Sequence, residues 1–151
     1  MKVLNVYKKF ISYMNKLLDI LTITAMLGMV GVVFYQVIMR QIFQRPPIWG
    51  EEVSVTFMIW FVFLGIVLGL HENLHIGIAM FVNKLPKKAQ FVIEIVVNLL
   101  IMLHATILLV YGYTYTAAIL NFGNRLTATG LPAGIHYVVT PIAGALMILV
   151  L

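Results

Sequence analysis

Long uncharged, apolar runs alternate with short polar segments along almost the whole chain. Four of these runs are close to the roughly 20 residues that a helix needs to cross the hydrocarbon core of a bilayer. We therefore predict four membrane-spanning helices, at about residues 20–39, 53–70, 91–115 and 132–151. In the third, the uncharged part begins at Ile95, directly after Glu94. The expected fold is an all-α integral membrane protein with a single four-span domain, residues 1–151.

The first nineteen residues have the pattern of an amphipathic helix. Over residues 2–19, polar residues recur every three or four positions, with apolar residues on the opposite face. Because Lys2, Lys9 and Lys16 share the polar face, such a helix is suited to lie on an anionic membrane surface. The pattern leaves open whether this helix bends before the first span or continues straight into it.

The segment between the second and third spans contains a shorter apolar stretch. Ile76–Val82 is only seven residues long, too short to cross a membrane. Lys84, Lys87 and Lys88 follow it, and Pro86 would interrupt a helix. We expect a short interfacial helix here, anchored at the membrane surface by these three lysines.

The composition excludes a soluble domain and several kinds of chemistry. The chain is 62% apolar and 10% charged, against about 45–50% and about 25% in soluble domains. It has no cysteine, which excludes disulfides, thiolate metal sites and cysteine-based catalysis. The formal net charge is +5, but the basic residues lie at the ends of apolar runs. They form no continuous patch of the kind that binds nucleic acid, so we expect no nucleic-acid partner.

The distribution of lysine and arginine predicts the orientation of the chain. With the N-terminus inside, seven basic residues lie on the cytoplasmic side and three on the outer side. The first group is Lys2, Lys8, Lys9, Lys16, Lys84, Lys87 and Lys88, and the second is Arg40, Arg45 and Arg125. The positive-inside rule then places both termini in the cytoplasm. We also expect the first span to be an uncleaved signal anchor, and a short tail after Leu151 to be absent.

Ionisable residues near the spans suggest little chemistry. A haem held by two histidines needs both ligands at the same depth in the membrane. His104, in the middle of the third span, has no other histidine at its depth. We therefore expect no cofactor. We interpret His104 as a core residue that hydrogen-bonds a neighbouring helix. Glu94, with Asn98 one turn further on, is compatible with a proton- or cation-coupling carboxylate and with a simple capping role. No nucleophile, base and orienting group converge, so we do not expect an enzyme or a metal site.

Small residues and one polar segment mark candidate contact surfaces. Gly65 and Gly69 form a Gly-x-x-x-Gly pair in the second span, and Gly28 and Gly31 form a small patch in the first. The polar segment between these spans contains Arg40, Arg45, Trp49, Glu51 and Glu52, and it is stiffened by Pro46-Pro47. Two interpretations of it stay open: an ion-paired corner, or a docking surface on the outer side.

Four motifs together resemble a known family. They are Arg40-x-x-Phe43, Trp49-x-Glu51-Glu52, Trp60-x-x-Phe63-Leu64-Gly65 and Glu72-x-x-His75-Ile76. In this order and spacing, the chain resembles the small membrane subunit (DctQ-like) of tripartite ATP-independent periplasmic (TRAP) transporters. His71 and Ala79 depart from the pattern, at positions where the family often has arginine and aspartate, so any polar network there would differ.

The resemblance implies a non-catalytic subunit of a secondary transporter in the bacterial inner (cytoplasmic) membrane. Its partners would be a large permease subunit, which holds the substrate and sodium sites and moves by an elevator mechanism, and a periplasmic binding protein that delivers an organic acid (a carboxylate or sugar acid). The small subunit would steady the static scaffold. We expect the N-terminal helix and the second span, through Trp60, Gly65 and Gly69, to contact the large subunit. We expect the binding protein to dock near Arg40, Arg45, Trp49, Glu51, Glu52 and Arg125.

Two alternatives belong to other classes of protein. One is a self-sufficient small homodimeric exporter that uses Glu94 to couple transport to a cation. The other is a haem-bearing electron carrier, which the unequal depths of the histidines disfavour.

Overall fold

The computed structural model describes residues 2–71 and 86–151, with side chains from Tyr13 to Leu70 and from Pro86 onward. The helices are α1 (Lys2–Gln41), α2 (Ile48–His71), α4 (Lys87–Asn121), the short 3-10 helix η1 (Ala133–His136) and α5 (Val139–Val150). Four helical stretches in this part of the chain are long and apolar enough to cross a membrane. The prediction of an all-α protein with four membrane-spanning helices is therefore confirmed.

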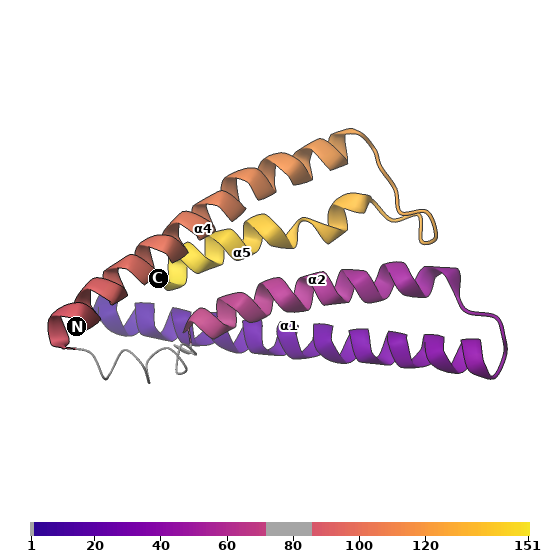
Figure 1. Cartoon of the computed structure of the whole chain (residues 1–151), viewed down its shortest axis with the longest axis horizontal. Helices are drawn as coiled ribbons and strands as arrows, with labels where there is room; N and C mark the ends of the chain where they lie inside the picture. The colour runs from indigo at the N-terminus through magenta and orange to yellow at the C-terminus, as the bar shows by residue number, and fades with distance from the viewer. Residues whose placement is uncertain (1, 72–85) are drawn as a thin grey trace.

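The helices form two antiparallel hairpins that share one core (Figure 1). α1 packs along α2, α5 packs along α4, and contact between α2 and α5 joins the two pairs. The core takes buried residues from all four helices, namely Leu18, Leu64, Val67, Ala105, Val139, Ala143 and Met147. Figure 1 shows that the hairpins lie close together near the start of α1 and diverge toward the opposite end.

The two ends of the bundle carry different basic residues. The starts of α1 and α4 lie at one end, with Lys87 and Lys88 in the first turn of α4, and we call it the lysine end. The α1–α2 corner and the loop that precedes η1 lie at the other end. This end holds Arg40, Arg45 and Arg125, and we call it the arginine end.

α1 answers the question that the sequence left open about residues 2–19. It is one helix of 40 residues, about 60 Å long at the usual rise of about 1.5 Å per residue. The expected amphipathic segment therefore continues directly into the first span. Whether its polar face lies on a membrane surface stays a prediction. The short interfacial helix expected at Ile76–Val82, with Lys84, lies outside the described residues.

The expected fourth span, residues 132–151, consists of two helical pieces. η1 ends at His136 and α5 begins at Val139. Pro141 explains the interruption, because it has no N–H to donate to a carbonyl one turn earlier and its ring would collide with the carbonyl of Tyr137. As the third residue of α5, Pro141 leaves the helix intact, since N–H groups in a first turn have no partner within the helix.

Close contact between α4 and α5 depends on a glycine that the sequence analysis did not single out. A Cβ atom on Gly144 would lie 2.6 Å from the backbone nitrogen of Leu109 and 2.8 Å from the carbonyl oxygen of Ala105. Only a residue without a side chain permits this approach of the two backbones. By contrast, a Cβ on Gly31 or Gly65 would meet no other atom within 4 Å.

We expect the substitution Gly144→Ala to destabilise the bundle, because α5 must move away from α4 to accommodate the methyl group. The expected loss is about 1–3 kcal/mol, as for other overpacked contacts. The matched control is Gly31→Ala, where the methyl group has room and removal of a helical glycine stabilises by up to about 1 kcal/mol. Thermal unfolding of both variants in the same detergent measures the difference. Equal stability of the two variants would contradict the close α4–α5 contact.

Candidate functional site

The corner between α1 and α2 is held by contacts across the hairpin. Tyr35 of α1 stacks on Trp49 of α2, with ring centroids 5.9 Å apart and an interplanar angle of 22°. Gly50 is buried against Gln36, whose side chain would meet any added Cβ at 2.6 Å. Gln44 adopts the left-handed conformation, with φ of 54°, as the chain reverses. The corner is therefore a defined surface, in which Trp49 has a packing role within the hairpin.

Three charged residues of this corner are unpaired. Arg40, Arg45 and Glu51 are exposed, and their side chains make no hydrogen bond or ion pair with any residue of the ranges 2–71 and 86–151. The described residues therefore do not form an ion-paired corner, which was one of the two interpretations of this segment. These three side chains are available to another molecule.

Glu52 differs from Glu51, because its carboxylate fastens the loop between α4 and η1. Its Oε1 accepts hydrogen bonds from the Thr127 hydroxyl at 2.9 Å and from the Ala128 N–H at 2.8 Å. Its Oε2 accepts from both the N–H and the hydroxyl of Thr129, each at 2.9 Å. Both carboxylate oxygens thus bind donors that come from one short stretch of loop, about 75 residues further along the chain.

These donors keep Glu52 ionised. The residue precedes the uncharged run 53–70, which is the part of α2 that we predict to cross the membrane. Partial burial by itself raises the pKa of the carboxylate, but the N–H groups of Ala128 and Thr129 and the hydroxyls of Thr127 and Thr129 lower it. The result is a pKa that falls from 4.5 to about 2. The carboxylate is therefore charged at neutral and mildly acidic pH, and the loop stays attached to α2 there.

The loop also has its own internal support. Arg125 donates from Nη1 to the carbonyl oxygen of Gly130 at 3.2 Å. The N–H of Leu126 donates to the carbonyl oxygen of Leu131 at 2.8 Å. Gly130 adopts a positive φ of 68°, which a side chain would disfavour. Among the charged residues predicted for docking, Arg125 and Glu52 thus have intramolecular partners.

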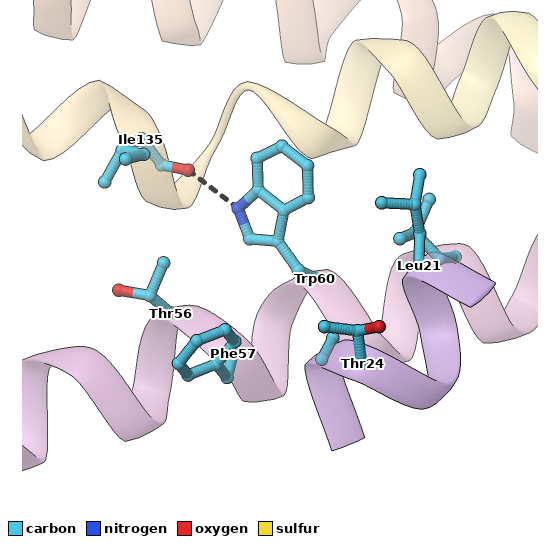
Figure 2. Close-up of a pocket in the computed structure, with 8 residues that line it drawn as sticks. Leu21, Thr24, Thr56, Phe57, Trp60 and Ile135 are labelled. Atoms are coloured by element: carbon cyan, nitrogen blue, oxygen red, sulfur yellow. Dashed lines mark hydrogen bonds between the residues drawn. The ribbon is translucent and has the colours of Figure 1, made fainter. Parts of the chain in front are cut away.

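Trp60 links the two hairpins, as Figure 2 shows. Its Nε1–H donates a hydrogen bond of 3.0 Å to the carbonyl oxygen of Ile135 in η1. The indole borders an apolar cavity of about 210 Å³, which Leu21, Thr24 and Phe57 also line. Trp60 was expected to contact a partner subunit, and the structure gives it an internal role. Gly65 is half-buried with open space beside it, and Gly69 is half-buried; their contact with a partner stays a prediction.

The three polar residues of α4 that the sequence singled out are on the surface. Glu94 and Asn98 are exposed, and their side chains make no hydrogen bond with any described residue. His104 is exposed too, so the prediction of a core histidine bonded to a neighbouring helix is wrong. The reason is its position on the helix: the next residue, Ala105, is buried against α5, and successive residues point about 100° apart.

The remaining candidate residues are the lysines expected to anchor the chain at the membrane surface. Lys16, Lys87 and Lys88 are exposed, as a membrane-anchoring role requires. The side chains of Lys2 and Lys9 lie outside the described part of the structure, and so does Lys84. Among the residues described, no three histidine, aspartate or glutamate side chains gather as metal ligands would.

Sequence reasoning missed the loop residues Thr127, Ala128 and Thr129. The available signal was weak: two hydroxyl residues shortly after Arg125, in a loop predicted to lie on the same side of the membrane as Glu51 and Glu52. Hydroxyl and backbone N–H groups in such a loop are potential donors to a carboxylate. The pairing itself spans too many residues for a local pattern to reveal.

Known proteins resemble this chain over most of its length. The family of tripartite ATP-independent periplasmic transporters, DctQ component, matches residues 29–151. A TRAP transporter small permease protein of Haemophilus influenzae is 35% identical over 135 residues, which cover 89% of this chain and 83% of that protein. The sialic acid TRAP transporter small permease protein SiaQ of Vibrio cholerae is 22% identical over 134 residues, or 89% of this chain and 76% of that protein.

A further relative is much longer. The sialic acid TRAP transporter permease protein SiaT of Haemophilus influenzae is 30% identical over 89 residues, which cover 59% of this chain but only 14% of that protein. The family match covers well over half of the chain, and its four apolar helices agree with a multi-pass membrane protein. The chain therefore belongs to the DctQ family, the small permease subunits of tripartite ATP-independent periplasmic transporters.

Proposed function

We propose that this chain is the non-catalytic scaffold subunit of a TRAP transporter, which steadies a large permease subunit while that subunit moves an organic acid across the bacterial inner membrane. One observation carries the proposal. In the described residues, no aspartate, glutamate, lysine or arginine lies within the uncharged runs 20–39, 53–70, 95–115 and 132–151, and Asp19 and Glu94 each directly precede such a run. A charged solute or ion crossing such a bundle would find no charged or metal-binding group at the centre of the bilayer.

The relatives support a lasting association with a larger permease. In SiaT, a segment similar to this chain makes up a small part of a much longer permease protein. A permease that carries such a segment within its own chain keeps the two permanently together. By analogy, the exposed apolar surfaces of α1 and α4, and the open space beside Gly65, offer room for a separate large subunit.

We place the arginine end in the periplasm and the lysine end in the cytoplasm. The positive-inside rule supports this orientation, since seven basic residues belong to the lysine side and three to the arginine side. The unpaired corner residues Arg40, Arg45 and Glu51 then face the compartment of the soluble binding protein. Sialic acid, named for SiaQ, is an organic acid, which supports this class of solute; a sodium gradient as driving force rests on the family alone.

The large subunit should co-purify with this chain. Extraction of a tagged chain from its native membranes in mild detergent is expected to recover a much larger membrane protein in stoichiometric amount. The reason is that a static scaffold must stay bound throughout the transport cycle. Recovery of the chain alone, as a clean homodimer, would contradict the proposal and favour the exporter that couples through Glu94.

Transport should require the partner and tolerate substitution of Glu94. The purified chain, reconstituted alone in vesicles, is expected to move no organic acid. In the complete transporter, Glu94→Gln is expected to retain most of the uptake, because the exposed carboxylate at the start of the uncharged run couples to nothing. Loss of uptake in this variant, with normal assembly, would make Glu94 a coupling group.

The neighbouring residues Glu51 and Glu52 should separate docking from stability. Glu51→Gln is expected to lower uptake without changing the unfolding temperature, because its carboxylate has no partner in the described structure. Glu52→Gln replaces one acceptor oxygen by an NH₂ group, which leaves two loop donors without an acceptor. We expect this variant to be cleaved several-fold faster by protease in the loop 122–132. If both variants had the same phenotype, the assignment of docking to Glu51 and of loop attachment to Glu52 would be refuted.

A further inference from the structure

A cleft of about 380 Å³ opens at the arginine end between α2, the loop that Glu52 fastens, and η1. One wall is a single face of α2, formed by Ile48, Glu51 and Val55, and the opposite wall includes Ala128 and His136. The volume is within the range of about 300–1,000 Å³ that binding pockets occupy. Because Glu52 holds the loop against α2, both walls of the cleft are fixed relative to each other.

The cleft is acidic. Glu51 and Glu52 both line it, and Glu52 keeps its negative charge while its oxygens accept the four loop hydrogen bonds. The carboxylate of Glu51 has no partner among the described residues. No lysine or arginine lines the cleft. An occupant with a positive charge would therefore be attracted by one free and one structural carboxylate.

His136 adds a polar side chain to the wall of the cleft. Its Nε2 atom is buried and has no hydrogen-bond partner in the described structure. The acceptor that an occupant can reach is the carboxylate of Glu51, which is exposed. A cationic occupant with N–H groups can donate charge-assisted hydrogen bonds to it, which an apolar group or an anion cannot do.

The apolar residues of the cleft favour a long side chain with a charged end. Ile48 is 84% exposed and, with Val55, offers an apolar surface beside the carboxylates. Lysine and arginine pack their aliphatic stems along such surfaces while the charged group reaches polar partners. A bare metal ion fits less well, because the two carboxylates and His136 do not gather as a ligand set.

We propose that this cleft receives a lysine or arginine side chain of the soluble periplasmic binding protein. The inference rests on the proposed function, which puts the arginine end in the periplasm and makes the binding protein the partner there. Arg40 and Arg45, unpaired on the neighbouring corner, would then face acidic side chains of the same protein. A surface with both signs of charge selects the orientation of a partner as well as attracting it.

The test uses the absence of cysteine from the chain. Ala128→Cys places a unique thiol in the cleft and keeps the backbone N–H that binds Glu52. Its reaction rates with a trimethylammonium-ethyl and a sulfonato-ethyl methanethiosulfonate are compared in membrane vesicles that hold the complete transporter. The ratio of the cationic to the anionic rate is divided by the same ratio for a free thiol in solution. We expect the result to be about five or more, in favour of the cationic reagent. Adding Glu51→Gln should remove most of this preference, and Glu51→Asp should keep it.

Phe43→Cys is the matched control at the corner, between the two arginines in the sequence. Here the anionic reagent should react faster. The soluble binding protein, added to the vesicles, should slow the cationic reagent at Ala128→Cys. No preference for the cation, or one that survives Glu51→Gln, would overturn the cleft as a cation site. Another outcome is that the cationic reagent is preferred at Ala128→Cys while the binding protein fails to slow its reaction. If the vesicles still take up solute from the binding protein, this result would overturn the assigned occupant and leave the proposed function standing.

Discussion

The contact of α2 with the second hairpin holds the molecule together at three levels. Near the lysine end, Val67 is fully buried in the core that α2 shares with α5. Further along, Trp60 donates its indole N–H to the carbonyl oxygen of Ile135. At the arginine end, Glu52 accepts four hydrogen bonds from the loop that leads into η1. Since the two hairpins diverge toward this end (Figure 1), polar contacts reach across where apolar packing is thinner.

The division of roles between Glu51 and Glu52 follows from helix geometry. Successive residues of a helix point about 100° apart, so two adjacent carboxylates cannot both bind the same donors of the loop. Glu52 lies on the side of α2 that carries Trp60 and Val67 and is used internally. Glu51 points in a different direction, lines the cleft between α2 and the loop, and its carboxylate remains free. One turn of helix can therefore both close the fold and present a charge to another protein.

Length and hydropathy were sufficient to predict the four spans, because a bilayer sets the number of apolar residues that a helix needs. They could not predict which face of each helix packs inward. In a membrane, residues that face lipid and residues that face protein are both apolar, so the periodicity that marks a buried face in a soluble helix is weak. His104 was assigned to the core for this reason, although Ala105 is the buried residue. Gly144 and the Thr127–Thr129 loop depend on pairings between distant segments, which a single sequence does not contain.

The same constraint bears on what such a bundle can do. A charged side chain at the centre of the bilayer costs about 2.5–3.5 kcal/mol or more, so chains retain one there mainly where it moves a solute or an ion. The described helices of this chain keep charged residues out of their long uncharged runs, while their close contacts, such as Gly144 on Ala105, favour a single arrangement. Rigidity in the membrane combined with charged surfaces outside it suits a part that stays still while another moves. Under the proposed function, the specificity for solute would belong to the moving subunit, and the choice of delivering protein would belong in part to this one.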